Sequence, residues 1–133
     1  GALLRNRNQQ FICQNIYMRT ETTNSAVTSV LEPGQVLKVP IAHAEGRFFA
    51  DDATMAEIIK NDQVLFRYCD KDGNVNDSTN VNGAVDNIAG ITNATRNVFG
   101  MMPHPERASE EQLGNTDGRA IFESLKATVL QMV

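Results

Sequence analysis

The chain has 133 residues, of which 41% are hydrophobic and 21% are charged, and this ordinary globular mixture argues against a wholly disordered protein. Twelve Lys and Arg residues against 16 Asp and Glu residues give a net charge of −4, which argues against a protein that tracks nucleic-acid phosphates. No apolar run reaches the roughly 18 residues that a transmembrane helix needs, and two cysteines are too few for a disulfide scaffold. We therefore expect one domain in the reducing cytoplasm, with no nucleic-acid or membrane partner.

The first 50 residues are expected to form strands joined by turns. Apolar, β-branched and aromatic side chains predict strands over residues 11–20, 25–31 and 35–42. Pro33 and Gly34 form a turn pair before the third segment. Pro40 lies inside that segment and has no N–H to donate, so we expect this strand at the edge of a sheet.

The middle of the chain predicts a helix followed by a buried strand. The helix covers residues 52–61, and Asp51 or Asp52 can cap it. Its expected buried face consists of Met55, Ile58 and Ile59. The nearly continuous apolar run at residues 63–69 predicts an interior strand.

The last third of the chain predicts a hairpin and a helix. After a polar loop, residues 88–92 and 97–102 are expected to be two short strands of one hairpin. An amphipathic helix that packs on the sheet is predicted from Thr116 or Asp117 to about Met132. Its apolar repeat consists of Ile121, Phe122, Leu125, Val129 and Met132. These elements fit either an α+β domain or the later part of an α/β sheet.

The segment around His104 is the strongest candidate for chemistry, because it follows a predicted strand end. Pro105 favours an extended His104, and side chains two residues apart in an extended chain point the same way, so Glu106 can hold the imidazole from behind. Such a carboxylate fixes the tautomer and stabilises the imidazolium that a general base becomes. The structural alternative is a solvent-exposed turn histidine, with Glu106 at the start of a helix.

His43 lies in a second His-x-Glu unit, with Glu45. Two His and two Glu side chains can bind a divalent ion, so a metal hydrolase is kept as an alternative. Cys13 and Cys69 lie within apolar strand segments and are expected to be buried structural cysteines. No Gly-x-Cys-x-Gly or Gly-x-Ser-x-Gly elbow is present, so the sequence offers a base and its orienting carboxylate without a nucleophile.

Three segments carry a resemblance to a known family. They read VPIAHAEGRF at residues 39–48, NGAVDNIAGI at residues 82–91 and GMMPHPER at residues 100–107. In this order they resemble the glutaminase subunits of phosphoribosylformylglycinamidine synthases, which are class I glutamine amidotransferases of purine biosynthesis. The resemblance extends over essentially the whole chain. It implies an open, mostly parallel, flavodoxin-like three-layer α/β domain, of which residues 1–133 are the C-terminal part.

By this resemblance, His104 is the base and Glu106 its orienting partner in a Cys–His–Glu triad that hydrolyses glutamine to glutamate and ammonia. The nucleophilic Cys of the family lies in an elbow in the N-terminal half of the domain, which we expect to be absent from residues 1–133. The chain alone is therefore expected to lack a nucleophile and to be inactive. The loop at His43 resembles a segment near bound glutamine, so His43 is a candidate wall of the site.

The resemblance also implies partners. Ammonia is expected to pass to the ATP-dependent synthetase subunit, and a small accessory subunit is a further candidate partner. ATP and Mg²⁺ are expected on the synthetase, because this chain has no phosphate-binding loop, and no cofactor or metal is expected here. The alternative function is a non-catalytic module that docks on the synthetase.

Overall fold

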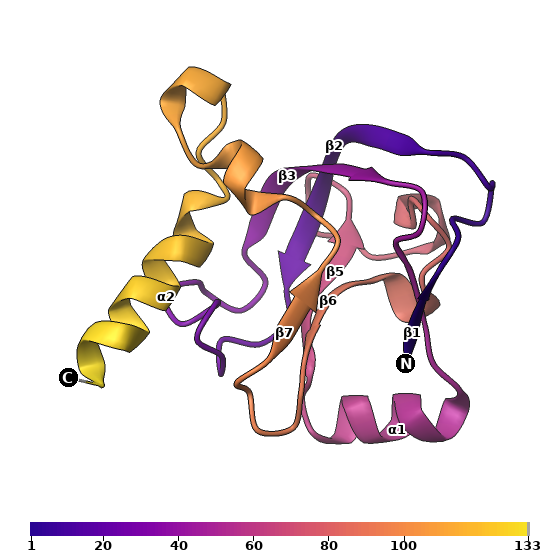
Figure 1. Cartoon of the computed structure of the whole chain (residues 1–133), viewed down its shortest axis with the longest axis horizontal. Helices are drawn as coiled ribbons and strands as arrows, with labels where there is room; N and C mark the ends of the chain where they lie inside the picture. The colour runs from indigo at the N-terminus through magenta and orange to yellow at the C-terminus, as the bar shows by residue number, and fades with distance from the viewer. Residues whose placement is uncertain (133) are drawn as a thin grey trace.

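The computed structural model describes residues 1–132 and contains two α-helices and seven strands, with short 3₁₀ helices between them (Figure 1). The strands are β1 Ala2–Leu4, β2 Ile12–Thr20, β3 Val36–His43, β4 Arg47–Phe49, β5 Val64–Cys69, β6 Ile88–Thr92 and β7 Phe99–Met101. The α-helices are α1 Asp52–Lys60 and α2 Arg119–Gln131. The 3₁₀ helices are η1 Asp77–Thr79, η2 Val85–Asn87, η3 Pro105–Ala108 and η4 Glu111–Leu113.

Five strands form the main sheet in the order β3-β2-β5-β6-β7, and β1 pairs with β4 in a second, two-stranded sheet. The α/β prediction is confirmed, but every strand pair among residues 1–132 is antiparallel, so the parallel pairs of the implied domain do not occur in this part of the chain. The connections between the strands explain this arrangement. Strands that are neighbours both in the sheet and in the sequence are joined by loops, which reverse the chain direction, whereas a parallel pair needs a crossover connection, usually a helix.

Most predicted elements are confirmed, including the hairpin of β6 and β7, but the strand predicted at residues 25–31 is wrong. That segment forms consecutive turns, in which Thr28 N donates to Ser25 O and Leu31 N donates to Thr28 O. It also packs on α2, because Val30 N donates to Ser124 Oγ at 3.1 Å. Its polar residues thus bond within turns and to a helix that lies far away in the sequence.

The expectation of an edge strand at Pro40 is confirmed, because β3 is the first strand of the sheet. The open side of β3 is covered by residues that follow β7. Lys38 N donates to Asp117 Oδ2 at 2.9 Å, and Asn115 Nδ2 donates to Lys38 O at 2.7 Å. His104 N donates to Pro40 O at 2.8 Å. These bonds protect the edge and attach the candidate site to it.

The core lies between the main sheet and the segments that cover it, and it is dominated by side chains of the central strands. The largest fully buried apolar side chains are Tyr68, Phe66, Met18, Ile41, Leu65 and Ile88. The interior position predicted for residues 63–69 is therefore confirmed. Helix α1 is capped by Asp51, whose Oδ1 accepts from Thr54 N at 2.7 Å.

Both helices bury fewer residues than their apolar patterns predicted. On α1, Met55 and Ile58 are buried, but Ile59 is 57% exposed because it points away from the sheet. On α2, only Ile121 and Ser124 are buried, and the expected packing of Phe122, Val129 and Met132 is wrong, since all three are exposed. The C-terminal half of α2 extends beyond the sheet (Figure 1). Between residues 1 and 132, no helix is long and apolar enough to cross a membrane.

Helix α2 also begins later than predicted, at Arg119, with Gly118 at its N-cap. Asp117 is not available as a cap because its carboxylate binds β3. Gly118 lies against η3: a Cβ atom at this position would come within 2.3 Å of Pro105 O. Only glycine permits this close approach, which presses the start of α2 against the segment that carries His104.

Neighbouring isoleucines on α1 test this account of the helix. Ile58→Ala is expected to lower the free energy of unfolding by about 2–5 kcal/mol, because it leaves a cavity in the core. Ile59→Ala is the matched control and should change it by less than about 0.5 kcal/mol. Urea unfolding followed by circular dichroism measures both, and equal losses at the two positions would contradict the orientation of α1.

Candidate active site

His104 and Glu106 are joined by a hydrogen bond of 2.7 Å between Nδ1 and Oε1. The two side chains are 33% and 56% exposed. The geometry differs from the extended pairing expected from sequence, because Glu106 lies in the first turn of η3 and reaches back to His104 at its N-cap. The sequence allowed Glu106 either to orient His104 or to begin a helix. In the structure it does both, because the start of η3 brings its carboxylate to His104.

This arrangement suits a general base. Ionised Glu106 can only accept, so the proton on His104 lies on Nδ1 and the lone pair lies on Nε2 when the ring is neutral. The carboxylate favours the imidazolium that forms when Nε2 takes up a proton. The pair can thus receive a proton from a nucleophile and return it to a leaving group.

The backbone around His104 is held from several sides. Pro103 and Pro105 are buried, and both fix φ angles next to the histidine. His104 N donates to Pro40 O, and Arg119 Nε donates to Ser109 O at 2.9 Å at the far end of η3. The imidazole therefore projects from a fixed backbone, as the positioning of a catalytic group requires.

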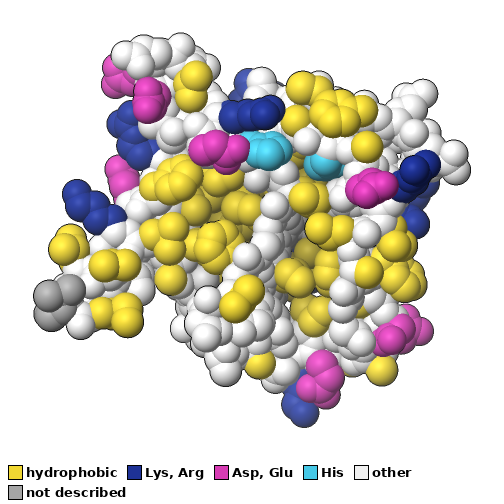
Figure 2. Space-filling model, viewed as in Figure 1, with side chains coloured by type: hydrophobic (Ala, Val, Ile, Leu, Met, Phe, Trp, Pro, Cys, Tyr) yellow, Lys and Arg dark blue, Asp and Glu magenta, His cyan; other side chains and the backbone are white. Residues whose placement is uncertain are grey.

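His43 lies at the end of β3, and the residue is only 7% exposed. Figure 2 shows the two histidines of the chain on the same face of the molecule. Burial lowers the pKa of His43 below its ordinary value of 6.5, the charge of nearby His104 lowers it further, and a backbone hydrogen bond partly opposes both effects. His43 is consequently a buried, neutral neighbour of a more exposed histidine.

Two asparagines that the sequence analysis did not single out hold the loop after His43. Asn6 is 1% exposed, and its Oδ1 lies 3.0 Å from His43 Nδ1. Asn82 is 2% exposed, and its Nδ2 donates to Gly46 O at 3.0 Å. A Cβ atom at Gly46 would lie 2.6 Å from the His43 ring, so the loop closes tightly on the imidazole. The sequence does not predict these contacts, because each asparagine lies in a polar loop, some 36 residues or more from the group that it binds.

Neither cysteine is arranged as a nucleophile for His104. Cys69 is buried as expected, and burial raises the pKa of its thiol to about 11, so the thiol is protonated at neutral pH. The expectation that Cys13 is buried is wrong, because it lies on the exposed side of β2, where its strand has a neighbour only at β3. Within residues 1–132, no hydrogen bond connects either thiol to His104.

The metal site considered as an alternative is not formed by the part of the chain that the structure describes. No three His, Cys, Asp or Glu side chains there come close enough to hold an ion. Glu45 instead pairs with Arg5 at the surface, at 3.4 Å. The two His-x-Glu units therefore have different roles, since only the one at His104 joins its own histidine and carboxylate.

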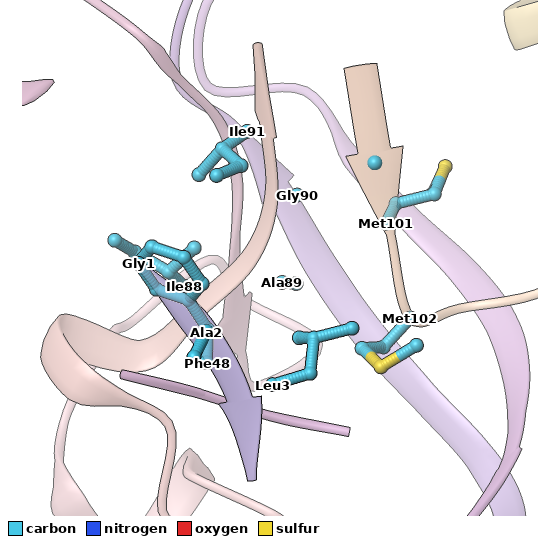
Figure 3. Close-up of a pocket in the computed structure, with 11 residues that line it drawn as sticks. Gly1, Ala2, Leu3, Phe48, Ile88, Ala89, Gly90, Ile91, Met101 and Met102 are labelled. Atoms are coloured by element: carbon cyan, nitrogen blue, oxygen red, sulfur yellow. The ribbon is translucent and has the colours of Figure 1, made fainter. Parts of the chain in front are cut away.

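An apolar cavity of about 290 Å³ lies near the candidate site, between β1, β4, β6 and β7 (Figure 3). Its lining includes Leu3, Phe48, Ile88, Ile91, Met101 and Met102. Met102 is two residues from His104, so the cavity adjoins the segment that carries the pair. With no titratable side chain in its lining, it suits an apolar group rather than the charged ends of an amino acid.

Comparison with protein families gives one match that covers most of the chain. The family model described as "CobB/CobQ-like glutamine amidotransferase domain" matches residues 1–125.

Individual relatives are similar over nearly all of the chain. A phosphoribosylformylglycinamidine synthase subunit PurQ from Koribacter versatilis is 54% identical over 125 residues, which cover 94% of this chain and 54% of the relative. The protein of the same name from Gloeobacter violaceus is 50% identical over 133 residues, which cover 100% of this chain and 57% of the relative. The solved structure of PurLQS from Thermotoga maritima contains a chain that matches with a TM-score of 0.79 and 38% identity, over 97% of this chain and 53% of its own length. The chain spans about half the length of the curated relatives it matches.

The buried state of His43 predicts how stability depends on pH. Because the pKa of His43 is lower in the folded than in the unfolded chain, the unfolded chain binds more protons between these two values. The free energy of unfolding should therefore fall as the pH decreases below about 6.5. Urea unfolding of wild type and His43→Phe between about pH 8 and pH 5 measures this contribution as the difference between the two profiles. Parallel profiles would contradict a buried, neutral His43.

Proposed function

Because the chain belongs to the CobB/CobQ-like glutamine amidotransferase domain family, we propose that it is the C-terminal part of a glutaminase subunit of phosphoribosylformylglycinamidine synthase. The observation that carries the proposal is the 2.7 Å bond between His104 Nδ1 and Glu106 Oε1, which leaves Nε2 as a base. The names of relatives at about half identity over nearly all of this chain support the specific enzyme.

In the proposed reaction, His104 Nε2 takes the proton from a cysteine thiol. The thiolate then attacks the side-chain amide carbon of glutamine. The protonated imidazole, held at Nδ1 by Glu106, gives that proton to the departing nitrogen, and ammonia leaves. One proton thus moves from sulfur to nitrogen, and a glutamyl thioester remains.

Water completes the cycle in the same geometry. His104 removes a proton from the water that attacks the thioester carbon, and it returns this proton to the thiolate that leaves. Glutamate is released, and both the thiol and the neutral imidazole are restored. Glu106 stabilises the imidazolium in each half of the reaction.

We assign the nucleophile to a cysteine outside these 133 residues. The thiol of Cys69 is buried and has a raised pKa, and the thiol of Cys13 lies on a strand rather than at a helix N-terminus, where a thiolate is favoured. Relatives about twice as long as this chain have room for a separate nucleophile segment.

The proposal extends to partners and location. Ammonia would pass to an ATP-dependent synthetase subunit, with ATP and Mg²⁺ bound there, and a small accessory subunit is a further proposed partner. The name of the solved PurLQS complex, in which a chain resembles this one, supports such an assembly. We place the reaction in the cytoplasm, in line with two cysteines that are both free thiols.

Loss of the base should remove only the reaction that needs glutamine. In the intact synthase, His104→Ala is expected to lower the glutamine-dependent rate by about 10²–10⁴-fold. The rate with free ammonia should stay close to wild type, because it bypasses glutamine hydrolysis. Rates with the two nitrogen donors test this, and equal losses with both would favour a docking module without catalysis.

Loss of the orienting carboxylate should give a similar pattern with a smaller effect. Glu106→Gln is expected to lower the glutamine-dependent kcat by about 10²-fold, because a misplaced imidazole transfers protons poorly. Glu110→Gln, a few residues further along, is the matched control and should retain nearly full activity, since no hydrogen bond or ion pair of Glu110 involves His104. Equal activities of the two variants would refute the role of Glu106.

A further inference from the structure

Asn6 makes several hydrogen bonds to the loop that begins at His43, although no sequence motif marks this residue. Its side chain is almost completely buried. Nδ2 donates to His43 O at 2.8 Å and to Gln10 O at 2.8 Å. Oδ1 faces His43 Nδ1 at 3.0 Å and accepts from Gly46 N at 3.4 Å, while Asn6 N donates to Ala44 O at 2.8 Å. One residue thus binds both the backbone of the loop and the ring that it carries.

These contacts determine which nitrogen of His43 carries the proton. The two carbonyl oxygens beside Asn6 Nδ2 fix the orientation of the amide, because only its NH₂ group can donate to them. The oxygen that remains toward His43 can only accept. His43 Nδ1 must therefore donate, and the neutral ring has its lone pair on Nε2.

That lone pair is buried without a partner. Across the residues that the structure describes, no group makes a hydrogen bond to His43 Nε2, although the atom is shielded from solvent. Buried polar atoms without partners are rare in native proteins, so each one calls for an explanation, such as a role in catalysis or a bound water or ion. His104 N donates to Pro40 O at 2.8 Å, three residues before His43 on β3, and both histidines lie on the same face of the molecule (Figure 2).

We infer that Asn6 is a positioning residue of the glutaminase site, which fixes His43 as the Nδ1-protonated tautomer and so leaves the buried Nε2 as the hydrogen-bond acceptor of this ring. Its action on catalysis rests on the proposed function, whereas the tautomer does not. A histidine with the proton on Nε2 would present a donor at the same place and reverse the polarity of that wall. The amide at position 6 thus decides whether His43 Nε2 accepts or donates a hydrogen bond.

Nitrogen-15 NMR of the intact polypeptide tests the inference directly. In the wild type, Nδ1 of His43 should be the protonated nitrogen and Nε2 the unprotonated one. Asn6→Ala should shift the ring toward the Nε2-protonated form, and Asn8→Ala, a matched change in the same loop, should not. Protonated Nε2 in the wild type would overturn the inference without reference to any variant. An unchanged tautomer in folded Asn6→Ala would overturn it as well, and Asn6→Ser offers a milder change of the same contacts.

Kinetics of the same variants separate this inference from the proposed function. In the intact synthase, Asn6→Ala should lower kcat/KM for glutamine by on the order of 10- to 100-fold and leave the ammonia-dependent rate unchanged. Asn8→Ala should leave both rates unchanged. If the wild type hydrolyses no glutamine, the proposed function fails while the tautomer result still stands. If the tautomer changes in Asn6→Ala while glutamine kinetics do not, the positioning role is overturned and the proposed function survives.

Discussion

The hydrogen bonds on the open edge of β3 are the constraint on which the rest of the site depends. Pro40 has no N–H, so at this residue the edge can only accept a hydrogen bond. His104 N donates to Pro40 O at 2.8 Å. Two residues earlier on β3, Lys38 N donates to Asp117 and Lys38 O accepts from Asn115. A sheet edge that would otherwise invite pairing with another strand is thus used to fix the segment that carries the candidate base.

The same edge brings two histidines together in different environments. His104 is partly exposed and bound to a carboxylate, whereas His43 is buried and bound to an amide. Burial lowers the pKa of His43 and so favours its uncharged ring, whereas Glu106 orients the ring of His104 through Nδ1. Two side chains of one type thereby meet different surroundings, which is how neighbouring groups acquire separate roles in a site.

Local patterns predicted what depends on local physics, and they missed what depends on distant contacts. The apolar run of β5, the donor missing at Pro40 and the pairing of His104 with Glu106 all follow from a few neighbouring residues. The turns at residues 25–31 and the exposure of Ile59 depend on which surfaces meet after folding. Asn6 could not be found from sequence, since an asparagine in a polar loop signals a turn, and its partner His43 lies 37 residues away.

The most direct test of the central claim locates the nucleophile that His104 activates. A diazoketone analogue of glutamine alkylates the thiolate of a glutaminase at its amide-binding position, and peptide mass spectrometry of the intact polypeptide identifies the labelled residue. The account predicts a label on a cysteine outside these 133 residues, formed in the wild type and greatly reduced in His104→Ala. A label on Cys13 or Cys69, or labelling that does not depend on His104, would contradict it.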